Sequence, residues 1–122
     1  MENENAYQAP GSIKISQDVV ASIAKFVALE IDGVESISAG RGVKGLLARV
    51  NYVKPIRVQF GDDDVVTVGI DIVAKNGVYI PEVAGVVQRN IKNAIQNMTG
   101  LAVSRVDVVV AGTASEATDA AE

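Results

Sequence analysis

The stretch VTVGIDIVAKNGVYIPEVAGVVQRNIKNAIQNMTGLAVSRVDVVVAG, Val66 to Gly112, decides the fold. It opens with an alternating pattern that predicts a long strand over 65–75, with Val66, Val68, Ile70 and Ile72 on one face. Its end is a strongly β-branched run, Leu101 to Ala111, which predicts a second strand. The segment VDVVV favours burial of that strand on both faces near its end.

Between these two strands the pattern changes to helical spacing. Asn76-Gly77 predicts a turn, and Pro81 is expected at the first helical position, where its missing N–H costs nothing. Gly100 is expected to close the helix in the left-handed conformation. The predicted inner stripe of the helix is apolar and consists of Val83, Val87, Ile91, Ala94, Ile95 and Met98. The outer face is rich in amides and bases, which is typical of either a solvated surface or a lateral contact.

The preceding half predicts more elements of the same kinds. We expect a short strand over 12–16, then a helix over 17–31 with Ser16 as N-cap and Gly33 as a left-handed cap. A short strand over 34–38 precedes a glycine-rich loop and a weak helical turn over 46–53. The strand over 56–60 should form a hairpin with 65–75 through a turn at 61–64.

The predicted fold class is therefore α+β: a two-layer sandwich with two main helices on one face of a small mixed sheet, in the order β-α-β-β-β-α-β. We expect a single domain over 12–111, between a disordered arm (1–11) and a disordered acidic tail (112–122).

Composition narrows the classes of function. The 122 residues include no Cys and no His, which excludes thiol chemistry and removes the commonest acid–base catalyst and zinc ligand. No apolar run approaches the roughly 18–20 residues that span a bilayer, and the acidic N-terminus is unlike a secretion signal. We therefore expect a cytoplasmic protein without a cofactor or metal.

The charge is unevenly distributed. The net charge is −4, but five of the fifteen acids lie in the end segments 1–11 and 112–122, so the part between them has ten acids and eleven bases. Five bases without an intervening acid are Arg41, Lys44, Arg49, Lys54 and Arg57, and just beyond them lies the triplet Asp62, Asp63 and Asp64. Both groups are interpreted as solvated surface or as candidate interaction residues. Asp62 to Asp64 together with Asp71 could also hold Mg²⁺, although a solvated hairpin turn is the preferred interpretation.

The glycine-rich loop matches two binding motifs. Gly40, Gly42 and Gly45 spell the dinucleotide pattern G-x-G-x-x-G, and Gly42 to Gly45 spell the G-x-x-G of RNA-binding KH modules. The dinucleotide interpretation fails because Pro55 leaves room for at most nine helical residues after the loop. The RNA interpretation lacks an aromatic platform, since Phe60 is expected to face the core. We favour a mobile surface loop, and keep nucleic-acid binding through 40–57 as the alternative function.

The same stretch that decides the fold also resembles a known family, the alkaline-shock or envelope stress response proteins of Gram-positive bacteria. The matching motifs are Gly-x-x-Ile-Pro-Glu-Val at Gly77 to Val83, NMTGL at Asn97 to Leu101, and VDVVVAG. The opening GSIKISQDVVASIAKFVALEIDGV, Gly11 to Val34, fits as well, whereas 43–64 departs from the family. The signature residues Gly77, Pro81, Glu82, Thr99 and Gly100 all have ordinary roles at turns and helix ends.

This resemblance implies a non-enzymatic protein linked to cell-envelope stress. It also implies self-assembly into a homo-oligomer and recruitment to the membrane by a separate anchor protein. We therefore expect a scaffold or adaptor at the cytoplasmic side of the envelope, and we do not expect nucleic acid as its partner.

Overall fold

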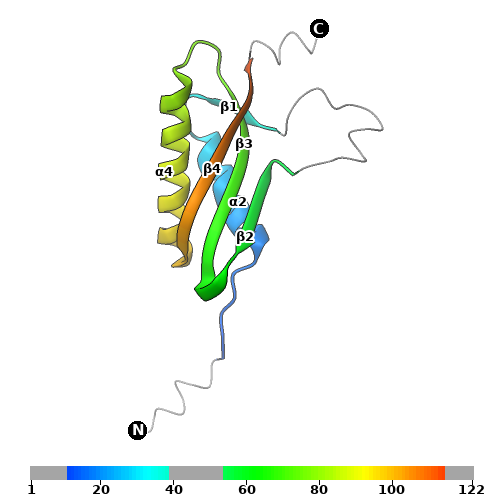
Figure 1. Ribbon diagram of the computed structural model, residues 1–122, viewed down its shortest axis with the longest axis vertical. Coiled ribbons are helices and arrows are strands. Elements are labelled where there is room, and N and C mark those ends of the chain that lie inside the picture. The colour runs from blue at the N-terminus through cyan, green and yellow to red at the C-terminus, as the bar shows by residue number, and fades with distance from the viewer. Residues whose placement is uncertain (1–10, 39–53, 115–122) are drawn as a thin grey trace, which may run out of the picture.

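The computed structural model describes residues 11–38 and 54–114, which form a helical layer packed on one face of a four-stranded sheet (Figure 1). The predicted fold class is confirmed. The elements, in chain order, are α2 (Gln17–Leu29), β1 (Val34–Ile37), β2 (Ile56–Phe60), the 3-10 turn η1 (Asp62–Asp64), β3 (Val65–Ala74), α4 (Ile80–Thr99) and β4 (Ala102–Thr113).

The sheet is built around β3. β1 and β2 both pair antiparallel with β3, β2 through Val58 opposite Val68 and β1 through Val34 opposite Ala74. β4 pairs parallel with β3 over its whole length. Parallel neighbours need a crossover connection, and α4 provides it. The sheet is therefore mixed, as predicted.

The core lies between the sheet and the two helices. Alternate residues of β3 are fully buried on the helix-covered face, and α4 buries one residue per turn against them. α2 adds small and β-branched side chains, which let the helices approach the sheet closely. The core residues include Val20, Ala24, Ala28, Val66, Val68, Ile70, Ile72, Val87, Ile91 and Ile95.

Two predictions about the first strands and helix were wrong. Residues 12–16 are not a strand, because no other strand pairs with them in the described part of the chain, and Ile13 is exposed. Ser16 does cap α2, accepting a hydrogen bond from the Val19 N–H at 3.2 Å. Gly33 is not a left-handed cap, since α2 ends at Leu29 and Gly33 has no positive φ.

Gly33 has a packing role instead. A Cβ at this position would overlap the Cγ2 methyl of Val83 in the first turn of α4. Glycine is therefore required here because another part of the chain approaches closely, and the turn itself does not demand it.

The second helix follows its prediction closely except at Met98, which was expected in the inner apolar stripe but is 70% exposed. It begins at Ile80, one residue before the expected start at Pro81, and Gly100 ends it in the left-handed conformation with φ 77°. Thr99 donates a hydrogen bond from its hydroxyl to the Ile95 carbonyl at 2.6 Å and accepts one from the Leu101 N–H at 3.1 Å. Gly77 has φ 89° in the turn after β3, and Glu82 lies in the first turn of α4.

Two further predictions of burial were wrong. Val109 is 49% exposed, because β4 is an outer strand and the helices cover only one face of the sheet. Phe60 shares the face of Val66 by register, yet it is 40% exposed because it lies at the end of β2, beside the irregular residues Ile13 and Ile15. β4 continues to Thr113, two residues past the predicted domain end, and the rest of the predicted arm and tail lies outside the described residues except for Gly11 and Ala114.

Candidate protein-interaction surfaces

The basic segment is only partly within the described residues. Arg41, Lys44 and Arg49 lie outside them, as do the glycine motifs and the helical turn expected over 46–53. Lys54 is exposed. Arg57 is held by its own chain: Nη1 donates to the Lys54 carbonyl at 2.6 Å, and Nη2 donates to Asp71 Oδ1 at 3.0 Å.

The pair formed by Arg57 and Asp71 lies on the sheet face that the helices leave open. The two side chains are 38% and 12% exposed. Gly69 lies opposite Arg57 in the sheet, and a Cβ there would come within 3.0 Å of the Arg57 Nη2. Because Gly69 has no side chain, the Arg57 guanidinium can pass over it to reach Asp71, two residues further along β3. Asp71 is therefore not available for an intermolecular contact.

The acidic triplet lies at the other end of β3. Asp62, Asp63 and Asp64 form the exposed turn η1, which the Gly61 N–H closes by donating to the Val65 carbonyl at 2.7 Å. Six residues of β3, Val65 to Ile70, separate Asp64 from Asp71, and Asp71 is occupied by Arg57. The interpretation of these four carboxylates as one Mg²⁺ site was therefore wrong, and no His, Cys, Asp or Glu cluster of three fit for a metal occurs in the described ranges.

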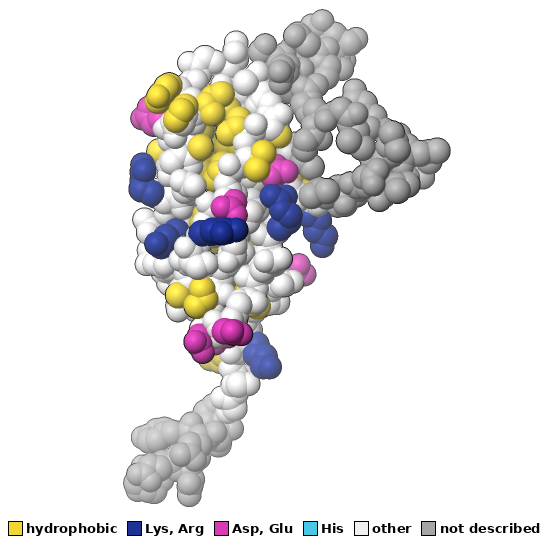
Figure 2. Space-filling view, viewed as in Figure 1, with side chains coloured by type: hydrophobic (Ala, Val, Ile, Leu, Met, Phe, Trp, Pro, Cys, Tyr) yellow, Lys and Arg dark blue, Asp and Glu magenta, His cyan; other side chains and the backbone are white. Residues whose placement is uncertain are grey.

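Charged side chains of both signs cross the middle of the open sheet face, and hydrophobic side chains gather beyond them toward one end of the molecule (Figure 2). Besides the pair in β2 and β3, β4 contributes Arg105 and Asp107, whose Nε and Oδ2 atoms lie 3.1 Å apart. This second pair is more than half exposed, so it contributes about 0–1 kcal/mol to stability. The charged side chains in the middle of the open face are thus paired with one another within the chain.

The amide-rich face of α4 divides into two parts. Gln88 donates from Nε2 to the Val106 carbonyl at 3.1 Å, and Gln96 Oε1 accepts from the Val103 N–H at 3.4 Å. These two amides satisfy backbone groups of β4, an outer strand whose unpaired groups would otherwise be a template for pairing with another chain. Asn90, Asn93 and Asn97 are not used in this way.

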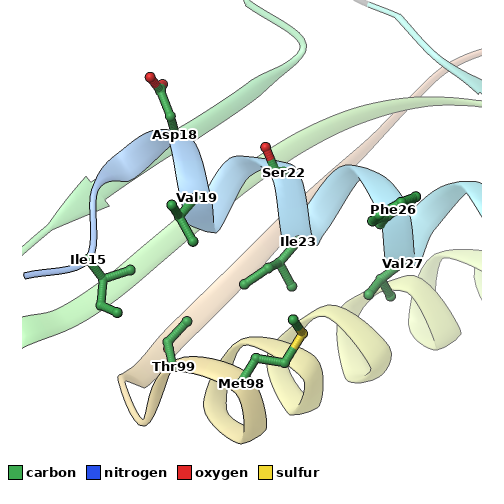
Figure 3. A pocket seen from close by; sticks show the side chains of 9 residues that line it. All are labelled: Ile15, Asp18, Val19, Ser22, Ile23, Phe26, Val27, Met98 and Thr99. Carbon is green, nitrogen blue, oxygen red and sulfur yellow. The ribbon is translucent and has the colours of Figure 1, made fainter.

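An apolar hollow of about 400 Å³ lies where the start of α2 meets the end of α4. Val19, Ile23 and Val27 point from α2 toward the end of α4, and Met98 projects back toward them (Figure 3). Phe26 and Met98 are 73% and 70% exposed. The other residues that line it are Ile15, Asp18, Ser22 and Thr99.

A second hollow continues along the same helix–helix seam. Its volume is about 420 Å³, and it shares Val27 with the first. Its lining is more polar and consists of Val27, Glu30, Ile31, Asn90, Asn93, Ala94 and Asn97. We call the two hollows together the α2–α4 groove.

The groove was missed by the sequence analysis, although the sequence carries a signal for it. Apolar residues at helical spacing predict an inner stripe for the first helix, which consists of Val20, Ile23, Ala24, Val27 and Ile31. Val19, Phe26 and Leu29 lie outside this stripe, and all three are exposed. Val19 and Phe26 are seven residues apart and therefore share one face of the helix. A second apolar row on a surface helix is typical of a contact surface.

Comparison with known proteins identifies the class to which this two-layer α+β domain belongs. The chain belongs to the alkaline shock protein family, which has a cell envelope-related function and whose model matches residues 5–115. The resemblance stated from the sequence motifs is thereby confirmed. The family is not known as a family of enzymes.

The chain has curated relatives in Bacillus subtilis and in Streptococcus pyogenes. The chain is 32% identical to the uncharacterized protein YqhY of B. subtilis over 114 residues, which are 92% of this chain and 82% of the relative. It is 32% identical to the uncharacterized protein Spy1614 of S. pyogenes over 104 residues, which are 82% of this chain and 85% of the relative. The uncharacterized B. subtilis protein YloU is 27% identical over 106 residues, covering 84% and 88%. No solved structure matches the chain.

Neither helix of the described ranges is both long and apolar enough to cross a bilayer.

Proposed function

We propose that this protein is a non-enzymatic scaffold or adaptor of the cell envelope, which self-associates and is held at the cytoplasmic side of the membrane by an anchor protein. The observation that carries the proposal is the exposed apolar lining of the α2–α4 groove. Covering Phe26 with a partner would remove on the order of 100 Å² of apolar surface from water, which is worth about 2.5 kcal/mol. The envelope-related function of the family supports the proposed place of action.

The chemistry of the chain also favours contact over catalysis. A chain without His or Cys has only carboxylates, Lys, Tyr, Ser and Thr for catalysis. The partly buried carboxylate, Asp71, forms an ion pair with Arg57, and neither residue lines the α2–α4 groove. The alternative function, nucleic-acid binding through 40–57, has one basic side chain fewer available for phosphate, because Arg57 forms its ion pair with Asp71.

Self-association is proposed to set the acidic turn Asp62 to Asp64 of one copy against the basic segment of the next, through Arg41, Lys44, Arg49 and Lys54. Asp62 to Asp64 are exposed, and none forms an ion pair with another described residue. A head-to-tail contact of this kind propagates unless its rotation closes a ring. Exposed ion pairs contribute about 0–1 kcal/mol each, so apolar contact must supplement them.

Light scattering coupled to size-exclusion chromatography tests the self-association, over a range of concentration and at low and high salt. We expect species that grow with concentration and shrink as salt increases. The double substitution Arg41→Glu and Lys44→Glu should weaken assembly, whereas the matched double substitution Lys75→Glu and Lys92→Glu should not. A wild-type monomer of 12.7 kDa under every condition would contradict self-association. Assembly unchanged in the Arg41/Lys44 variant would exclude this contact.

A further inference from the structure

We propose that the α2–α4 groove binds a basic amphipathic helix of a partner protein. The inference rests on the proposed adaptor function and adds to it the docking surface and the chemistry of the partner. Three features of the groove support it: its length and apolar anchors, the sign of its charges, and its row of free amides.

The groove has the form that receives a helix. α2 has 13 residues, so the seam beside it is about 20 Å long, enough for three to four turns of a partner helix. Val19 and Phe26 on α2 and Met98 on α4 leave apolar surface exposed along the first hollow. A helix laid in such a groove inserts apolar residues at positions i, i+3 or i+4, and i+7.

The charge of the groove selects the partner's charge. Asp18 lines the first hollow and Glu30 lines the second, and no Lys or Arg lines either hollow among the described residues. Lys25 lies on α2 and is exposed, but it does not line the groove. A partner whose polar face carries Lys or Arg would find an acid near each end, which favours its association and fixes its register.

Asparagine side chains continue this polar lining along α4. Asn90, Asn93 and Asn97 are spaced by three and four residues, so they lie on one face of the helix. No hydrogen bond joins any of the three amides to another described residue. Each amide oxygen is therefore free to accept from a Lys or Arg side chain of the partner.

A second copy of this chain does not match the groove as well. The exposed face of α4 carries Arg89 and Lys92, but the apolar stripe of that helix is buried in the core. The described part of a second copy thus offers no exposed helix that is both apolar on one face and basic on the other. A separate partner protein supplies that combination.

The test is a titration of the ¹⁵N-labelled full chain, followed by NMR, with a synthetic helical peptide of Leu and Lys whose Leu residues recur at i, i+3, i+4 and i+7. Two control peptides replace Lys by Glu or scramble the Leu spacing. We expect saturable shifts centred on Val19, Phe26, Met98 and Asn93, and weaker binding of both controls.

Matched variants assign the binding to the groove. Phe26→Ala should weaken binding of the Leu/Lys peptide about tenfold or more, as expected for a central aromatic anchor. Tyr79→Ala should leave it unchanged, because Tyr79 is similarly exposed (71%) but does not line the groove. Glu30→Lys should weaken binding and lower its salt dependence, whereas Glu35→Lys, an exposed acid in β1, should not.

The inference is overturned if the Leu/Lys peptide does not bind, if the Leu/Glu peptide binds equally well, or if Phe26→Ala has no effect. Shifts at the same residues that grow with protein concentration alone would identify a second copy as the occupant. That result would overturn this inference and leave the proposed self-association intact. A protein that stays monomeric but still binds the peptide would contradict self-association and support this inference.

Discussion

The two helices of this domain use their apolar residues differently. α4 gathers its β-branched residues on one buried stripe, and two glutamines of its polar side satisfy the backbone of β4. α2 buries Val20 and Ala24 against the sheet but also exposes Val19 and Phe26 on a second row. The fold accounts for the whole inner face of α4 and only for one of the two apolar rows of α2. The unexplained row is the one that lines the groove.

The largest expected effect is on the inner face of α4. Ile91→Ala removes a fully buried side chain from the centre of the core and should lower the free energy of unfolding by about 2–5 kcal/mol. Met98→Ala on the same helix should cost far less, because Met98 is mostly exposed. Urea denaturation of both variants measures the difference, and equal losses would show that the two positions are packed alike.

The contact between Gly33, in the turn that follows α2, and the start of α4 is the next test. Gly33→Ala places a methyl group against Val83 and should destabilise the domain by about 1–3 kcal/mol. In the double variant Gly33→Ala/Val83→Ala the overlap is removed. The double variant should therefore lose less free energy of unfolding than the two single variants lose when their losses are added together. Strict additivity in denaturation midpoints would contradict this close approach.

A smaller effect is expected where α4 supports β4. Gln88→Ala removes the hydrogen bond to the Val106 carbonyl and should cost about 0.5–1.5 kcal/mol. Asn97→Ala, on the same helix but without a hydrogen-bond partner in the described chain, should change the free energy of unfolding by less. Amide hydrogen exchange in β4 should be faster for the first variant alone; unchanged exchange would mean that Gln88 does not hold the strand.

The smallest expected effect on stability is at the groove. Phe26→Ala should change the free energy of unfolding by no more than about 0.5 kcal/mol, because the ring is mostly exposed to solvent. A loss of several kcal/mol by thermal or urea unfolding would show that the ring belongs to the core.

The sequence predicts the parts of the fold that local chemistry determines. Alternation in β3, the helical stripe of α4 and the left-handed Gly100 each depend on a few neighbouring residues. Each was predicted correctly, apart from Met98 at the end of the stripe, which is exposed. The strand expected over 12–16 failed because a strand also requires a neighbour. The prediction of a left-handed cap at Gly33 failed because the close approach that favours glycine there involves Val83, fifty residues away in the sequence.

The candidate surfaces were harder to predict for the same reason. Nothing near Arg57 in the sequence shows that its guanidinium crosses Gly69 to reach Asp71, since only the register of β2 on β3 brings them together. The outer row of α2 was present in the sequence as Val19 and Phe26. Its significance appeared only when Met98 of the other helix completed the hollow.

The most direct test of the account is membrane flotation of cell extracts from the organism that produces this protein, comparing the wild type with Phe26→Ala and Tyr79→Ala. If the groove holds the protein to a membrane anchor, the wild type and Tyr79→Ala should float with the membranes. Phe26→Ala should remain in the soluble fraction at equal abundance. A wild-type protein found only in the soluble fraction, or a Phe26→Ala variant that floats as well as the wild type, would contradict the account.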